Sequence, residues 1–193
     1  MALKTLVKVG EITNLSDARY CAGMGVEMLG FNLNPHAESY ISPEQFREIT
    51  EWVAGVKFVG ELENVDEGTF REALSDYPVD LVQITSAQSS LIFDIDLPVI
   101  LSISSKENAL GIMEKIGEGV GYYLLDSHFD QAANASGKFP LLLGGPINPQ
   151  NVIQLLEKSD IKGIALKGSV EEKPGFKDYD QLADILEALE IDD

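Results

Sequence analysis

The sequence predicts an α/β fold, a (β/α)8 barrel in a single domain over residues 1–193. Short apolar runs of strand length recur along the chain, and helical or turn patterns separate them. Eight such runs are present: Leu6–Val9, Met28–Phe31, Phe58–Leu62, Leu81–Ile84, Val99–Ile103, Tyr122–Leu125, Leu141–Leu143 and Ile164–Leu166. Strands that alternate with helices pair in parallel, and eight strand–helix units close into a TIM barrel. An open doubly wound sheet is the alternative, but no switch point in the strand order is recognisable.

The first two connections carry helix start signals. Asn14 or Ser16 can cap a helix after the first run, because both side chains accept hydrogen bonds from free backbone N–H groups. In the second connection Ser42 precedes Pro43, and Gln45 occupies the capping-box position. Both connections are therefore expected to be helical.

The remaining connections are less uniform. Apolar residues at helical spacing predict helices in three of them: Asp66–Leu74, Ser104–Ile116 and Tyr179–Leu189. Asn148 is expected to cap the helix after the seventh run. Ser86–Ile95 is short and ambiguous, compatible with a single turn. Ser127–Phe139 is polar and is expected to be a mobile loop with little helix.

Composition limits the partners of the protein. The net charge of −18 repels polyanions, so we expect neither nucleic acid nor an anionic membrane surface to be a partner. The sequence contains no long apolar segment, no signal-peptide pattern and no Pro/Gly-rich linker, and its single cysteine, Cys21, cannot form an internal disulfide. These features favour a cytoplasmic protein, whose small phosphorylated ligand would need local positive charge.

Two glycine turns provide a candidate phosphate site. Gly144 and Gly145 follow the seventh run, and Gly168 and Ser169 follow the eighth. The loops after strands seven and eight of a barrel commonly bind phosphate through backbone N–H groups. Lys167, next to the second turn, supplies a cation. We therefore expect a small phosphorylated metabolite to bind here.

Other polar residues are interpreted more conservatively. His36 and His128 lie far apart in the sequence, so they form no paired set of metal ligands, and neither a metal nor another cofactor is predicted. The acidic cluster that includes Glu61, Glu63 and Asp66 is expected to be a solvated face. Glu61 or Glu63, at the end of the third run, is alternatively able to enter the pocket.

Short motifs in the same order along most of the chain add a resemblance. The segments are KVGEITNLSDA, GVEMLGF, SYISPEQ, KFVG, DLVQI, YLLDS, LLLGGPINPQNV and VEEKPGFKD. In this order they resemble the phosphoribosylanthranilate isomerase family. The resemblance implies a barrel, a phosphorylated substrate, and an Amadori rearrangement in tryptophan biosynthesis that uses a general acid and a general base.

The resemblance also exposes two missing side chains. It assigns the general acid to Asp126, but Gly10 stands where the family has its catalytic cysteine, and Ser39 stands where it has an arginine for the substrate carboxylate. Glu11 is the candidate substitute base, although alternation along a strand could turn it away from the pocket. Two interpretations follow: an isomerase-like relative that keeps the phosphate site but has altered or lost the isomerase activity, or an active isomerase with a substitute base such as Glu11.

Overall fold

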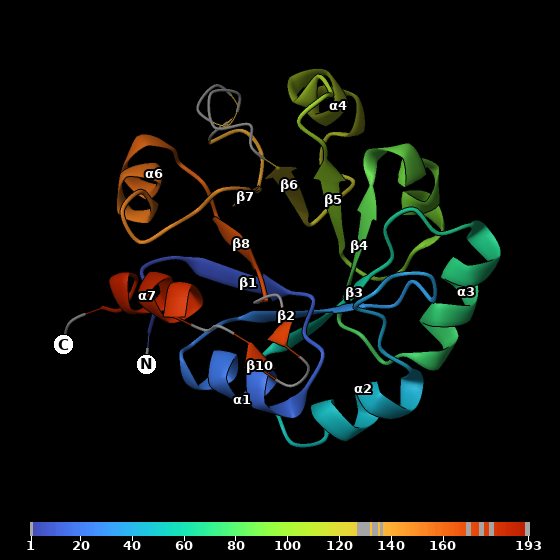
Figure 1. Cartoon of the computed structure of the whole chain (residues 1–193). Helices are drawn as coiled ribbons and strands as arrows, with labels where there is room; N and C mark the ends of the chain where they lie inside the picture. Colours follow the sequence, from blue (N-terminus) through green and yellow to red (C-terminus); the bar gives the residue numbers. More distant parts are fainter. Residues whose placement is uncertain are drawn as a thin grey trace.

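The computed structural model describes residues 2–126, 132, 135, 137–168, 171–173, 176–177 and 180–191. Eight parallel strands form a closed barrel in sequence order, and β8 pairs with β1 (Figure 1). The barrel strands are β1 (Leu6–Gly10), β2 (Met28–Asn32), β3 (Lys57–Glu61), β4 (Leu81–Thr85), β5 (Val99–Ile103), β6 (Tyr122–Asp126), β7 (Leu141–Gly144) and β8 (Gly163–Lys167). The predicted (β/α)8 barrel is confirmed.

Helices surround the barrel, as Figure 1 shows. They are α1 (Leu15–Gly23), α2 (Pro43–Thr50), α3 (Glu67–Asp76), the 3-10 helix η1 (Ser86–Asp94), α4 (Ala109–Ile116), α6 (Val152–Lys158) and α7 (Asp180–Ala188). A two-stranded antiparallel ribbon, β9 (Glu171–Lys173) and β10 (Phe176–Lys177), precedes α7. The predicted caps Asn14 and Ser42 are confirmed, because each accepts a hydrogen bond from a first-turn backbone N–H.

The apolar core has two layers. The larger one lies between the strands and the helices, and Phe31, Phe46 and Tyr77 pack there with edge-on rings. The smaller one fills the inside of the barrel. Its buried members are Met28, Val59, Leu81, Ile100, Leu124 and Leu142. Each fully buried side chain of this size stabilises the fold by about 1.5–3 kcal/mol.

Two connections differ from the expectations, and a third lies mostly outside the described residues. Ser86–Asp94 is a nine-residue 3-10 helix rather than a single turn. Asn148 does not cap α6, because its side chain accepts from the N–H groups of Gln150 and Asn151 in a preceding turn, and Asn151 is the N-cap. Most of the expected mobile loop at 127–139 lies outside the described residues. No helix in the described ranges is long and apolar enough to span a membrane.

Candidate functional site

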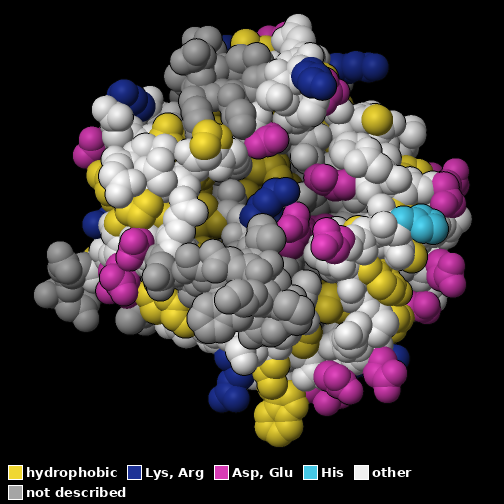
Figure 2. All heavy atoms as spheres, in the orientation of Figure 1, with side chains coloured by type: hydrophobic (Ala, Val, Ile, Leu, Met, Phe, Trp, Pro, Cys, Tyr) yellow, Lys and Arg dark blue, Asp and Glu magenta, His cyan; other side chains and the backbone are white. Residues whose placement is uncertain are grey.

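A cavity of about 580 Å³ opens at the carboxyl ends of the strands. Its polar lining follows from the period-two alternation of strands, because the residue two positions after each apolar interior residue also points inward. Glu61 follows Val59 in this way, and Gln83 follows Leu81. Figure 2 shows a basic side chain near the centre of this face, with several carboxylates around it. The barrel therefore places a polar layer directly above its apolar interior.

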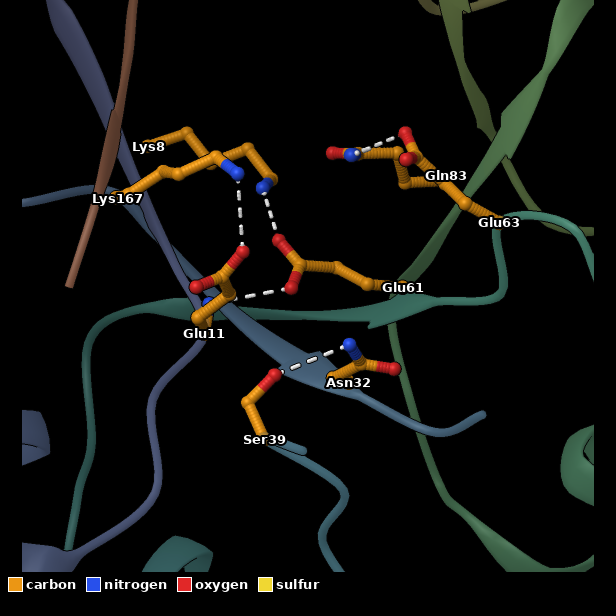
Figure 3. A network of polar contacts seen from close by, with 8 residues as sticks. All are labelled: Lys8, Glu11, Asn32, Ser39, Glu61, Glu63, Gln83 and Lys167. Atoms are coloured by element: carbon orange, nitrogen blue, oxygen red, sulfur yellow. Dashed lines mark hydrogen bonds and ion pairs between the residues drawn. The ribbon is translucent and has the colours of Figure 1, made fainter. Parts of the chain in front are cut away.

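A buried ion pair crosses the inside of the barrel. Lys8 Nζ lies 2.5 Å from Glu61 Oε1, and the two side chains are only 3% and 10% exposed. Figure 3 shows Lys8 reaching from β1 to Glu61 at the end of β3. The sequence left two alternatives for the acidic cluster, a solvated face or entry of Glu61 or Glu63 into the pocket. For Glu61 the solvated face is therefore wrong. The two buried charges depend on each other, because either charge buried without its partner would strongly destabilise the fold.

Two glycines make room for the Glu61 carboxylate. A Cβ atom on Gly10 would overlap Glu61 Oε1 and lie 3.1 Å from Lys8 Nζ. A Cβ atom on Gly30 would overlap the same oxygen and lie 3.0 Å from the Gly10 Cα. The Glu61 carboxylate thus occupies the space into which a side chain at position 10 would project. This is the position to which the resemblance assigns the catalytic cysteine.

Glu11 faces the cavity because it no longer follows strand alternation. Its φ of +56° lies in the left-handed region, which few residues other than glycine adopt. Its backbone N–H donates to Glu61 Oε2 at 3.1 Å. Its Oε1 lies 3.1 Å from Lys167 Nζ, and this hydrogen bond, together with the Glu11 charge, raises the pKa of Lys167. The pair sits at the cavity mouth, where the Lys167 side chain is 81% exposed.

The opposite side of the cavity is built from β2, β3 and β4. Gln83 Nε2 donates to Glu63 Oε1 at 2.9 Å, and Gln83 is only 7% exposed. Asn32 Nδ2 donates to Ser39 Oγ at 3.1 Å. Figure 3 shows both pairs around the Lys8–Glu61 ion pair. Ser39, the position of the missing arginine, therefore contacts a residue that lines the cavity.

The glycine turns at β7 and β8 are explained partly by packing. The N–H of Gly168 donates to the carbonyl of Gly10 at 2.8 Å, and a Cβ atom on Gly168 would lie 3.0 Å from that oxygen. Gly144 and Gly145 line the cavity, and Gly145 has a φ of +93°. Six residues separate Gly145 from the start of α6 at Val152, so the expected helix terminus does not follow the turn directly.

The other predicted residues have different outcomes. Asp126 is exposed at the end of β6 and lines the cavity. His36 is exposed and does not line it. Ser169 and His128 lie outside the described residues. In the described ranges, no three His, Cys, Asp or Glu side chains are arranged to hold a metal ion. Strand alternation from Val59 is the signal that would have identified Glu61 as a cavity residue.

A closed (β/α)8 barrel with charged residues at the carboxyl ends of its strands defines a class of proteins whose ligands bind at that face. The family model for N-(5'-phosphoribosyl)anthranilate (PRA) isomerase matches residues 7–188. The chain therefore belongs to the PRA isomerase family.

Individual relatives agree with this assignment. N-(5'-phosphoribosyl)anthranilate isomerase of Nitrosomonas eutropha is 28% identical, with 97% of each chain covered. The same enzyme of Aquifex aeolicus is 28% identical, with 93% of this chain and 96% of that chain covered. The crystal structure from Thermotoga maritima has a TM-score of 0.80 at 25% identity and covers 96% of this chain and 98% of that chain.

A further solved structure contains a ligand. It is a phosphoribosyl anthranilate isomerase in complex with reduced 1-(o-carboxyphenylamino)-1-deoxyribulose 5-phosphate. It has a TM-score of 0.80 at 26% identity, and it covers 96% of this chain and 98% of that chain. That protein therefore binds a molecule that carries both a phosphate and a carboxyl group.

Proposed function

We propose that this protein binds a small phosphorylated metabolite and has altered or lost the Amadori isomerase activity of its family. The phosphate is held at the ends of β7 and β8, by Gly144, Gly145, Lys167, Gly168 and Ser169. The observation that carries the proposal is the Glu61 carboxylate in the space of a side chain at position 10.

The phosphate site is supported by the position of Lys167 and the β7 turn. Both line the cavity, and loops after strands seven and eight are where barrels commonly bind phosphate. The related protein of the ligand complex binds a sugar phosphate. Because the ammonium of Lys167 is paired with Glu11 in this protein, phosphate has to displace that carboxylate or share the lysine with it.

The change in chemistry is supported by the missing side chains. Glycine has no group that can take a proton, and serine cannot make the bidentate contact that an arginine makes with a carboxylate. Loss of one proton-transfer group typically lowers the rate about 10²–10⁴-fold. Losing the carboxylate anchor as well weakens substrate binding. We therefore expect little turnover of phosphoribosylanthranilate.

A titration with inorganic phosphate tests the site. A ligand that binds only the folded state raises the melting temperature as its concentration increases. We expect phosphate to raise the melting temperature of the wild type and to raise that of Lys167→Met by less. Glu72→Gln, on the outer face of α3, is the matched control and should respond as the wild type does. A flat response in the wild type up to tens of millimolar would rule out the site.

A second candidate function is an isomerase with a substitute base, and the position of Glu61 favours it specifically. Its carboxylate lies next to Gly10 and is paired with Lys8 inside the barrel, whereas Glu11 is paired with Lys167 at the mouth. If the purified protein converts phosphoribosylanthranilate, Glu61→Gln and Glu11→Gln identify the base. A loss of kcat in only one variant assigns the role to that residue, and Asp126→Asn tests the proposed acid in the same assay.

A further inference from the structure

One residue that lines the cavity has a buried acceptor atom without a donor. The Oε1 atom of Gln83 has no hydrogen-bond partner, although the residue is 7% exposed. The amide is oriented by its other end, because Nε2 donates to Glu63 at 2.9 Å, and a carboxylate can only accept. Figure 3 shows the oxygen on the side toward Lys8 and the nitrogen toward Glu63. Buried polar atoms are rarely unsatisfied, so a donor from outside the chain is expected here.

The cavity also has an excess of negative charge. Among the described residues that line it, four are carboxylates, namely Glu11, Glu61, Glu63 and Asp126, and two are lysines. Both lysines are already in ion pairs, Lys8 with Glu61 at 2.5 Å and Lys167 with Glu11 at 3.1 Å. Within the same part of the chain Glu63 has no ion-pair partner. Its carboxylate and the Gln83 oxygen therefore form a region of acceptors that makes no ion pair with a cation of the described residues.

The number and arrangement of the acceptor groups in this region favour an amine over a metal ion as the ligand. In the described ranges no three carboxylate, histidine or cysteine side chains are arranged around a point that would hold a metal. A protonated primary amine has three N–H donors and one positive charge, which suits two separate acceptors from Glu63 and Gln83. A carboxylate, such as the one on the ligand of the related complex, would be repelled.

We propose that the β3–β4 side of the cavity is a subsite for the ammonium group of the ligand, formed by Glu63 Oε2 and Gln83 Oε1 with Glu61 beside them. Together with the proposed function, on which this part rests, the subsite defines the ligand as a phosphorylated amine, such as an amino sugar phosphate. The phosphate lies at β7–β8 and the amine lies across the cavity.

Calorimetric titrations of the full chain at low salt test the subsite with two matched pairs of probes. Glucosamine 6-phosphate differs from glucose 6-phosphate by one amine, and glucosamine differs from glucose in the same way. We expect the amine to improve affinity by at least about tenfold in the phosphorylated pair, since hydrogen bonds to charged groups are strong. Glu63→Gln should remove most of this preference, and Glu72→Gln, outside the cavity, should retain it.

The outcomes separate the two proposals. Equal affinity within both pairs, or a preference that persists in Glu63→Gln, would overturn the ammonium subsite. If inorganic phosphate does not bind but glucosamine is still preferred to glucose, the phosphate site is wrong and the ammonium subsite stands. If phosphate binds and neither pair shows a preference, the phosphate site stands and the subsite is wrong.

Discussion

The carboxylate of Glu61 lies where a side chain on Gly10 would project, and it contacts Lys8 instead. Two strands contribute glycine to this arrangement, since a Cβ atom on Gly30 would overlap the same Glu61 oxygen. The loss of a side chain from β1 and the presence of a carboxylate on β3 are thus a single structural feature. A side chain can be restored at position 10 only if the Glu61 carboxylate is removed.

Gly10→Cys alone should therefore be harmful. Its Cβ and thiol would overlap the Glu61 carboxylate, and overpacking of this kind costs about 1–3 kcal/mol. We expect a lower free energy of unfolding and no gain in isomerase activity, measured by denaturant titration and by phosphoribosylanthranilate consumption. Combining Gly10→Cys with Glu61→Ala and Ser39→Arg clears the space and restores the anchor, so any trace activity should rise. If Gly10→Cys is as stable as the wild type, the overlap is not real.

Removing one partner of the buried ion pair should be costly. Glu61→Gln leaves the Lys8 ammonium, 2% exposed, without its counter-charge. The expected loss is about 3–5 kcal/mol of unfolding free energy. The double variant Lys8→Met with Glu61→Gln should be more stable than Glu61→Gln alone, because no charge is then left buried. Denaturant titration of the wild type, Glu61→Gln, Lys8→Met and the double variant gives the coupling energy, and additive effects would mean that the two groups do not interact.

Glu11→Gln should strengthen phosphate binding. The variant removes the carboxylate that holds the Lys167 ammonium, and the pKa of that lysine should fall toward its ordinary value while the group stays charged at neutral pH. An ion pair this exposed is worth about 0–1 kcal/mol, so affinity for phosphate should rise by at most about fivefold. Calorimetry measures the change. Weaker binding in Glu11→Gln would show that Glu11 helps to hold the anion.

Alkaline pH should reveal the burial of Tyr123. Its hydroxyl donates to the carbonyl of Gly117 at 2.6 Å, and burial raises its pKa to about 12. Because the folded state favours the protonated phenol, this stabilisation is complete below the unfolded pKa of about 10 and is lost as the pH rises through about 12.

The matched variant is Tyr123→Phe. At neutral pH it should lose about 1 kcal/mol with the hydrogen bond, and the difference from the wild type should shrink between pH 10 and about 12. Melting temperatures over this pH range provide the measurement. A difference that does not change with pH would mean that Tyr123 does not titrate in this way.

The barrel was predictable because each strand is a local pattern. The first predicted run, Leu6–Val9, differs from β1 by one residue, and the capping box at Ser42 determined the start of α2. The site was harder to predict from the sequence, because its main contact joins Glu61 to Gly10 and Gly30, and only strand pairing brings these residues together. Glu11 shows a second reason. Its left-handed backbone breaks the alternation from which its orientation was inferred.

The most direct test of the proposed function is the rate at which the purified wild type consumes phosphoribosylanthranilate, followed by fluorescence with Asp126→Asn as the control. Typical enzymes turn over about 1–10³ times per second. The proposal of altered or lost isomerase activity predicts a rate well below that range and little difference between the two proteins. A wild-type rate within that range that disappears in Asp126→Asn would contradict it.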